Sequence, residues 1–272
     1  MKRPIKVFVK PNKLGEGAIC ADLLPEIQKN TPFKTLLFPE LLGNYINQTG
    51  VNALVFRYDN GTRYDSIWNV DNGGSTLKLQ LVAEILNVID DLLKVDINPV
   101  IKWFKKENLY PVEFNYKNWM NAFNDSPQTA FDLGLKGNDY TRAYNLLRQG
   151  FSNSKMIFNN GDFYTRNFIK SEQKGKVLLV DWQYWGVQAR ANFIDYTQNV
   201  VAFAYIHMWG NQQWLTEIID ESIEKFDLDV VDLRKAIMIK SFEQAKLWQQ
   251  QGALDLALIQ MQLFRRALNN QL

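Results

Sequence analysis

The stretch NGDFYTRN, at residues 160–167, decides how the rest of the chain is interpreted. A short apolar run at 155–158 precedes it, and the segment Phe-Ile-Lys at 168–170 follows it. A glycine-containing turn then leads into residues 176–180, of which the last four, V-L-L-V, are apolar. Alternating strand-like runs separated by a turn signal are typical of a β-hairpin. The sequence therefore predicts a hairpin that directly follows a polar loop.

Four polar side chains are spaced around this hairpin. Asp162 and Asn167 lie in the loop, and Asp181 follows fourteen residues after Asn167, at the end of the second strand. Asp195 comes a further fourteen residues on. Because Asn167 and Asp181 each flank one strand of the hairpin, we expect the two side chains to lie close together.

Phosphoryl transfer from a nucleotide to a hydroxyl group needs few covalent roles. One carboxylate takes the hydroxyl proton, while an amide and a second carboxylate hold the magnesium ion that bridges the phosphates. Magnesium prefers oxygen ligands and takes few of them from the protein. The chain offers Asp162 as the base and Asn167 and Asp181 as the Mg²⁺ ligands. The structural alternative is a hairpin whose Asp and Asn only form turns, which both residues favour.

The pattern resembles the catalytic loop of the aminoglycoside phosphotransferase and choline kinase-like family, a branch of the protein-kinase-like fold. That loop reads H-G-D-x-x-x-x-N and is followed by an apolar strand ending in I-D-W. This chain has N-G-D at 160–162, then Asn167, then V-D-W at 180–182. The resemblance covers about residues 5–250. It implies that Asp195 lies on the next helix and braces the catalytic loop.

The chain departs from the family pattern at two places. Asn160 replaces the loop histidine, and an asparagine can still brace the loop because its amide both donates and accepts hydrogen bonds. Lys10 resembles the lysine that contacts the nucleotide phosphates, but only nine residues precede it, so the N-terminal lobe looks shortened. We expect Glu26, on a helix at 22–30, to pair with Lys10. A solvated lysine at the end of a strand is the alternative.

The strand expected at 53–58 would lead to the hinge between the lobes. Backbone groups around Phe56 and Tyr58 would then bind the purine of ATP or GTP. The glycines at 15 and 17 are read as a plain turn, since Gly-x-Gly without a third glycine is a weak signal. The aromatic side chain of Trp182 either stacks on the acceptor substrate or packs in the core.

Composition excludes several other functions. The 272 residues include 31 Lys and Arg against 29 Asp and Glu, so the net charge of +2 does not fit a protein that binds nucleic acid through its phosphates. A single histidine, His207, and a single cysteine, Cys20, argue strongly against Ser-His-Asp hydrolysis and Cys/His zinc clusters. No apolar run reaches the roughly 20 residues of a membrane span. We expect a cytoplasmic protein without membrane or nucleic-acid partners.

From the residues, the sequence predicts a strand at 4–10, a helix that starts at Ser75 or Thr76 and has an apolar face within 81–93, and four helices at about 191–208, 212–226, 230–250 and 253–269. Together with the resemblance, these elements predict an α+β, two-lobed protein-kinase-like fold, with a reduced nucleotide-binding lobe at 1–57 and a helical lobe at 58–272. The resemblance implies a small-molecule kinase that uses Mg²⁺ and ATP or GTP to phosphorylate a hydroxyl of an aminoglycoside, sugar or amino alcohol. The alternative is a non-catalytic, pseudokinase-like nucleotide-binding module, favoured by the short lobe and by Asn160. A hydrolase using Asp162 is a weaker alternative, because no second base or nucleophile has a supporting partner.

Overall fold

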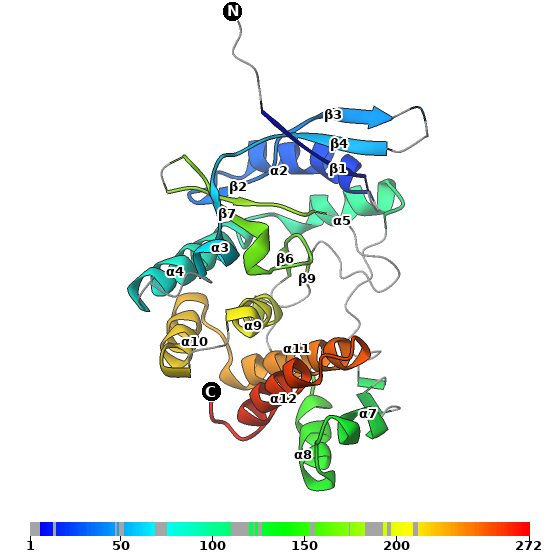
Figure 1. The fold of residues 1–272 in the computed structure, drawn as a ribbon, viewed down its shortest axis with the longest axis vertical. Coiled ribbons are helices and arrows are strands. Elements are labelled where there is room, and N and C mark those ends of the chain that lie inside the picture. The colour runs from blue at the N-terminus through cyan, green and yellow to red at the C-terminus, as the bar shows by residue number, and fades with distance from the viewer. Residues whose placement is uncertain are drawn as a thin grey trace, which may run out of the picture. The chain divides into compact units, whose positions relative to one another are not determined.

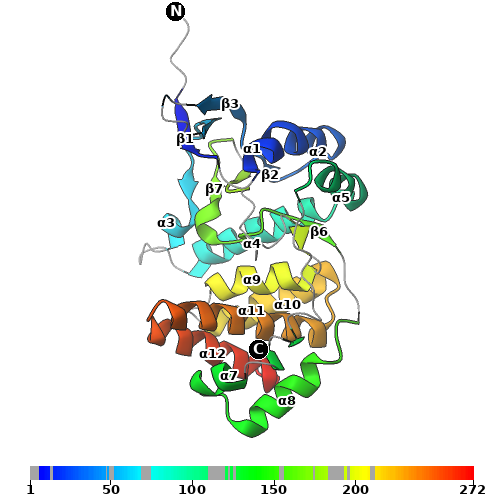
Figure 2. The ribbon, with the colours of Figure 1, turned by 90° about the vertical axis from the view of Figure 1, so that its right-hand side faces the viewer.

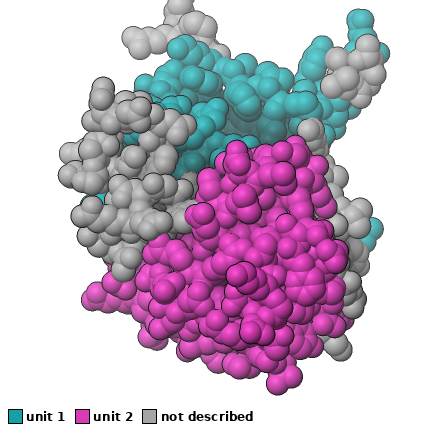
Figure 3. Space-filling model, turned by 60° about the horizontal axis from the view of Figure 1, so that its bottom comes forward, with its two compact units in different colours: residues 1–113, 156–194 teal, residues 114–155, 195–272 magenta. Residues whose placement is uncertain are grey.

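The structure is a computed structural model and describes most of the chain, namely residues 6–12, 15–46, 48, 52–68, 75–109, 120–121, 123–124, 127–152, 156–173, 175–182, 193–194, 197–208 and 212–272. The chain divides into two compact units (Figure 3): unit 1 contains residues 1–113 and 156–194, and unit 2 contains residues 114–155 and 195–272. Unit 1 extends past the boundary expected at residue 57 and also contains the hairpin and the helices between residues 64 and 106.

Unit 1 begins with a three-stranded antiparallel sheet in the order β1-β4-β3 (Figure 1). The strands are β1 (Val7–Pro11), β3 (Leu41–Ile46) and β4 (Asn52–Arg57). The central strand β4 alternates between exposed and buried side chains, as expected for a sheet with one covered face. The two expected strands, near residues 4–10 and 53–58, are therefore present, whereas β3 was not predicted.

A continuous helical segment covers one face of this sheet (Figures 1 and 2). It consists of α1 (Glu16–Ala18), the π-helical turn η1 (Ile19–Leu23) and α2 (Leu24–Asn30). A Cβ atom on Gly17 would lie 3.1 Å from the Leu54 side chain of β4, so a glycine at this position permits close packing of helix on sheet. The helix therefore begins at Glu16, six residues before the start expected from the sequence.

The predicted hairpin forms part of a second sheet in unit 1. Its strands β7 (Phe168–Lys170) and β8 (Val177–Leu179) are antiparallel. Two short strands extend the sheet, with β2 (Leu36–Leu37) parallel to β8 and β5 (Thr62–Arg63) antiparallel to β7. A separate pair consists of β6 (Ile157–Phe158) and β9 (Phe193–Ile194).

The helices of unit 1 are α3 (Tyr64–Trp68), α4 (Ser75–Leu92) and α5 (Ile97–Lys106). Helix α4 begins at the serine expected as a helix start. Its apolar side chains at the helical repeat are buried, at Leu81, Val82, Ile85, Leu86, Ile89 and Leu92. The 3.6-residue period of this segment therefore predicted both the helix and its buried face.

Near the end of α4, the buried carboxylate of Asp91 anchors the start of β2. It accepts hydrogen bonds from the backbone N–H groups of Lys34 (3.1 Å), Thr35 (2.6 Å) and Leu36 (2.9 Å). Burial acts to raise the pKa of Asp91, but these N–H donors and Lys94 outweigh burial and hold the pKa below its usual range. The ionised carboxylate therefore stabilises the folded state.

We expect Asp91→Ala to lower the free energy of unfolding by about 3 kcal/mol, because it leaves three backbone donors without their acceptor. The matched control is Asp90→Ala, which removes an exposed carboxylate that also pairs with Lys94 and should cost less than about 0.5 kcal/mol. The pKa of Asp91 is lower in the folded state than in the unfolded state. Its contribution to stability is therefore fully present at pH values above the usual carboxyl pKa, and it is lost as the pH falls through the pKa of the folded state. Urea unfolding at neutral and acidic pH measures both effects, and equal losses for the two variants would contradict this role.

Unit 2 is helical. Its elements are α7 (Pro127–Asp132), α8 (Gly137–Leu147), α9 (Thr197–Met208), α10 (Gln212–Phe226), α11 (Val230–Gln250) and α12 (Leu254–Leu268). Helix α11 packs against α9 and α12, which flank it in Figure 2. The four helices expected between residue 191 and the C-terminus are present, although the described part of the first begins at Thr197. In the described ranges, no helix combines the length and hydropathy needed to cross a bilayer.

Candidate active site

The loop between β6 and β7 carries the motif that the sequence analysis singled out. Gly161 has a positive φ of 73°, a conformation that a glycine adopts without steric cost. Its N–H donates to Oδ1 of Asn159, 2.6 Å away. The chain therefore turns sharply between Asn160 and Asp162 and directs consecutive side chains to different partners.

Asn160 is fully buried and ties this loop to the hairpin. Its Nδ2 donates to the carbonyl oxygens of Val180 (2.8 Å) and Asp162 (3.3 Å), and its Oδ1 accepts from the N–H of Asp162 (3.2 Å). The amide uses both its donor and its acceptor, which a histidine at this position does with two ring nitrogens. The bond to Val180 connects the loop to the residue immediately before Asp181.

Asp162 and Asn167 are in direct contact. Nδ2 of Asn167 donates to Oδ2 of Asp162 (2.9 Å) and to its carbonyl oxygen (2.8 Å). Oδ2 also receives a hydrogen bond from Nη2 of Arg166 at 3.2 Å. Because both contacts of Nδ2 orient the amide toward Asp162, its carbonyl oxygen is directed away from that carboxylate, as a metal ligand would require.

Asp181 follows β8 in a left-handed backbone conformation, with φ of 63°. Among residues with a side chain, aspartate and asparagine adopt this conformation most readily. The turn separates Asp181 from its neighbour Trp182, which is fully buried and stacks on Phe158 at 5.0 Å. Trp182 therefore packs in the core of unit 1, and Tyr184 and Trp185, the aromatic residues that follow it, lie outside the described residues.

Lys10, on β1, is held by two carboxylates. Its Nζ lies 2.6 Å from Oδ1 of Asp181 and 2.8 Å from Oε2 of Glu16 on α1. The other oxygen of Glu16 accepts a hydrogen bond from the N–H of Trp182 (3.1 Å). Lys10 therefore connects the first sheet, the helical segment and the end of the hairpin.

The prediction that Glu26 pairs with Lys10 is wrong. The observed partner, Glu16, belongs to the same helical segment. Glu26 is exposed on α2 and accepts a hydrogen bond from Nδ2 of Asn30 at 2.7 Å. Because the helix begins at Glu16 rather than near residue 22, the turn closest to β1 carries Glu16, and Glu26 lies more than two turns further along.

Burial and neighbouring charges act in opposite directions on the pKa values of Lys10 and Glu16. Desolvation acts to lower the pKa of Lys10, but Glu16 and Asp181 outweigh it and the pKa is raised. Burial raises the pKa of Glu16, and Lys10 opposes the rise only in part. Lys10 therefore stays charged at neutral pH and suits the binding of an anion.

A cavity of about 670 Å³ in unit 1 brings these groups together. Its lining comes from the first sheet, the start of the helical segment, residues 58–66 and the end of the hairpin, and includes Lys10, Glu16, Phe56, Tyr58, Asn167 and Asp181. Phe56 and Tyr58, near which the sequence predicts purine binding, both line this cavity. The backbone N–H groups of Arg57 and Tyr58, however, already have partners. The N–H of Arg57 donates to the carbonyl oxygen of Glu40 (2.9 Å), and that of Tyr58 donates to the carbonyl oxygen of Lys6 (3.1 Å). Purine hydrogen bonds from these two N–H groups are excluded by the pairing of the strands.

The donor set at the base of this cavity fits a hard divalent cation. Asn167 and Asp181 supply an amide and a carboxylate, which are oxygen ligands that Mg²⁺ accepts. The described residues contain no cluster of three or more His, Cys, Asp or Glu side chains, so they offer no site typical of zinc. A metal held by two side chains would take its remaining ligands from phosphate and water. Asp195, expected to brace the loop, lies outside the described residues.

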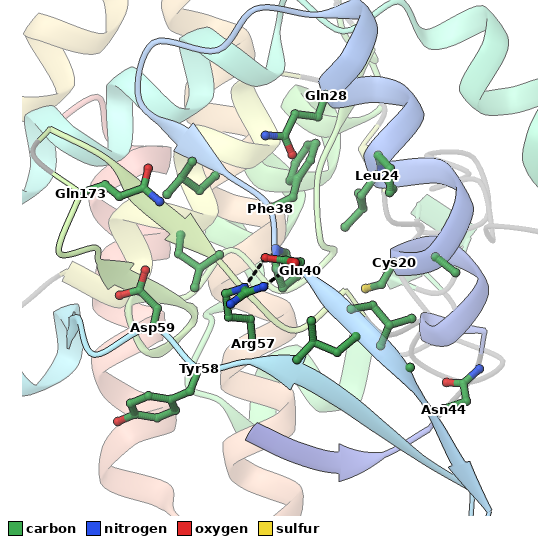
Figure 4. Close-up of a pocket in the computed structure, with 18 residues that line it drawn as sticks. Cys20, Leu24, Gln28, Phe38, Glu40, Asn44, Arg57, Tyr58, Asp59 and Gln173 are labelled. Atoms are coloured by element: carbon green, nitrogen blue, oxygen red, sulfur yellow. Dashed lines mark hydrogen bonds and ion pairs between the residues drawn. The ribbon is translucent and has the colours of Figure 1, made fainter. Parts of the chain in front are cut away.

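A second cavity in unit 1, also of about 670 Å³, lies beside the helical segment (Figure 4). Cys20 and Leu24 line one wall, and the exposed ion pair between Glu40 and Arg57 lies opposite. Burial raises the pKa of the Cys20 thiol well above its usual range. This cavity does not include Lys10, Asn167 or Asp181, but it adjoins the candidate active site, since Pro39, Arg57, Tyr58, Asp59 and Leu178 line both cavities.

No protein-family model matches the chain, and no curated protein matches it in sequence. Solved structures do match. The apo form of a thermostable mutant of aminoglycoside phosphotransferase APH(4)-Ia has a TM-score of 0.62 at 13% identity, over 98% of this chain and 87% of that one. The GDP complex of wild-type aminoglycoside 2'-phosphotransferase-IIIa has a TM-score of 0.59 at 12% identity, over 92% and 80%. The chain has the kinase-like fold of the aminoglycoside phosphotransferases.

Within this aminoglycoside phosphotransferase-like fold, sequence reasoning missed two residues of the candidate site. Glu16 was assigned to a turn, although its position six residues after Lys10 and next to Gly17 is compatible with a helix start. Arg166 was not singled out, although it precedes Asn167 directly in the quoted motif. Its position beside Asp162 depends on the short 3-10 turn η2 (Thr165–Asn167), which the loop composition did not indicate.

Proposed function

We propose that the protein transfers the terminal phosphate of ATP or GTP to a hydroxyl group of a small molecule. The observation that carries the proposal is the contact of Lys10 with Asp181 at one cavity of unit 1, together with the contact of Asp162 with Asn167, which lines the same cavity. Residues 171 positions apart in the sequence meet there, as a site for a charged nucleotide requires. Coincidental turn formation by Asp and Asn does not account for this convergence.

Each side chain has a distinct role in this reaction. Asp162 orients the acceptor hydroxyl and takes its proton, while Lys10 binds the donor phosphates and Glu16 holds Lys10 in place. Asn167 and Asp181 would hold Mg²⁺, which when bound neutralises charge on the phosphates. Asn160 keeps the loop attached to the hairpin through Val180.

The acceptor class follows the resemblance and the structural neighbours. One neighbour is a ternary complex of an APH(4)-Ia mutant with AMP-PNP and hygromycin B, with a TM-score of 0.62. Another is a complex with GDP and kanamycin, with a TM-score of 0.61. An aminoglycoside, a sugar or an amino alcohol is therefore the first class of acceptor to test, with both ATP and GTP as donors.

The proposal is tested on the wild-type protein in two steps. Thermal unfolding with Mg-ATP and Mg-GTP should show a rise in the melting temperature that neither nucleotide produces without the metal. Nucleotide turnover is then measured against a panel of hydroxyl compounds from these three classes. Binding without turnover across the panel would favour the non-catalytic module, and absence of binding would contradict both functions.

Glu16→Gln should weaken Mg-nucleotide binding by about tenfold, because a neutral amide no longer holds the Lys10 ammonium toward the cavity. Glu26→Gln is the matched control, since Glu26 is exposed and, among the described residues, bonds only within α2. The affinity of this variant for Mg-nucleotide should stay within about twofold of wild type. Isothermal titration calorimetry with Mg-ADP measures both. Equal effects of the two substitutions would refute the assignment of Glu16.

A further inference from the structure

Four cationic side chains line the cavity of the candidate active site: Lys10, Arg57, Arg63 and Arg166. Three of them are each held by two carboxylate contacts. Lys10 bonds to Glu16 and Asp181, Arg57 forms a two-point pair with Glu40, and Arg63 forms one with Asp65. Among the described residues, Arg166 makes one carboxylate contact, from a single nitrogen.

Arg166 is held in position but keeps most of its donors for another group. Its Nη2 lies 3.2 Å from Oδ2 of Asp162, and its guanidinium lies 4.9 Å from the centre of the Tyr164 ring. The side chain is 48% exposed and lines the cavity, so a ligand in the cavity can reach it. Since a guanidinium carries five N–H donors, this arrangement leaves donors for an anion.

The position of Asp162 indicates which anion Arg166 could bind. In the proposed reaction, Asp162 aligns the acceptor hydroxyl with the terminal phosphate. A guanidinium within hydrogen-bonding distance of Asp162 is therefore next to the phosphate that is transferred, and its planar fork matches two phosphate oxygens. Lys10 lies at Asp181, on the side of the cavity assigned to the metal and the remaining phosphates.

We propose that Arg166 is a catalytic residue that binds the terminal phosphate and stabilises the charge on its oxygens during transfer. The proposal rests on the kinase function proposed above. The acceptor oxygen forms a bond to the terminal phosphorus, and the bond from that phosphorus to the bridging oxygen breaks. The bridging oxygen keeps the electron pair and leaves with the nucleoside diphosphate, while Asp162 takes the hydroxyl proton. An arginine that performs this role from within the same chain raises turnover by several powers of ten in other phosphoryl-transfer enzymes.

The competing role for Arg166 is structural, as an ion pair that only positions Asp162. The two roles differ in one measurable respect. A residue that contacts the terminal phosphate affects the binding of a triphosphate analogue but not that of a diphosphate, whereas a structural residue affects both equally or neither. The comparison needs no knowledge of the acceptor.

The test is calorimetric titration of wild type, Arg166→Gln and Arg166→Lys with Mg-ADP and with Mg-AMP-PNP. We expect Arg166→Gln to weaken AMP-PNP binding at least tenfold and to leave ADP binding within about threefold of wild type, with Arg166→Lys intermediate. The matched control is Arg142→Gln, which removes another exposed arginine with a single aspartate ion pair, on α8, and should change neither affinity. Melting temperatures verify that each variant folds.

Three outcomes would count against the proposal. Equal weakening of both nucleotides by Arg166→Gln would assign a structural role, and unchanged affinity for both would exclude contact with the phosphate. Failure of the wild-type protein to bind either nucleotide would overturn the kinase function itself. Because that last result is seen before any variant is made, the failure of the two proposals can be told apart.

Discussion

Asp162→Asn is expected to lower turnover by at least about 10²-fold while nucleotide affinity stays within about threefold of wild type. A positioned general base contributes roughly 10²- to 10⁴-fold to such reactions, and an amide cannot accept the hydroxyl proton. The substitution keeps the shape of the side chain and the contact of its remaining oxygen with Asn167, which lies 2.9 Å from Oδ2. The measurement is steady-state turnover with the acceptor identified from the panel, alongside calorimetric titration of Mg-ADP.

The control for this experiment is Asp96→Asn. Asp96 also belongs to unit 1, but it is exposed at the start of α5, where it accepts a hydrogen bond from the N–H of Asn98, and it does not line the cavity of the candidate active site. Its loss should act on stability and not selectively on turnover. Turnover of Asp162→Asn at the wild-type rate would refute the assignment of Asp162 as the base.

Asp181→Asn is expected to weaken Mg-nucleotide binding by about 10²-fold, a larger loss than any other single change at the site should cause. The substitution removes the carboxylate proposed to hold Mg²⁺ and also one of the two anions that contact Lys10. Asparagine tolerates the left-handed conformation at this position, so the backbone turn before Trp182 is retained. Titration with Mg-ADP at several Mg²⁺ concentrations measures the loss, which excess metal should partly reverse.

Asp227→Asn provides the matched control, because Asp227 is exposed and also has a positive φ, 51°. It should leave both nucleotide affinity and melting temperature near their wild-type values. If Asp181→Asn bound Mg-nucleotide as tightly as Asp227→Asn does, the metal role assigned to Asp181 would be wrong.

Much of the fold could be predicted from local patterns. The apolar period of α4, the strand character on both sides of the 160–167 loop and the helical periods beyond residue 212 each reflect burial of one face, and the observed elements agree closely. Elements with weaker patterns were missed. Strand β3 carries Gly43 and exposed side chains, so its formation depends on pairing with β4 rather than on its own composition.

At the candidate site, too, some residues could be selected from the sequence and others could not. Asp162, Asn167 and Asp181 could be selected from the sequence because they share a motif and flank one hairpin. The partner of Lys10 could not, because helix periodicity does not report where a helix begins to within one turn. Gly15, at φ of 83°, and the π-helical turn η1 set the position of Glu16; the glycine indicates a turn but not the helix that follows it, and the π-helical turn has no clear signature in the residues.

The sequence by itself determined many of the strands and helices, the catalytic-loop motif and the order of its polar residues, because hairpins and amphipathic helices arise from interactions between near neighbours in the chain. The kinase-like fold class followed from the resemblance of that motif to a known family. Only the tertiary structure decided that Lys10 meets Glu16 and Asp181, that strand pairing uses the N–H groups of Arg57 and Tyr58, and that the guanidinium of Arg166 lies beside Asp162. These contacts depend on how separate elements pack, and packing brings together side chains whose distance in the sequence carries no information about their distance in space.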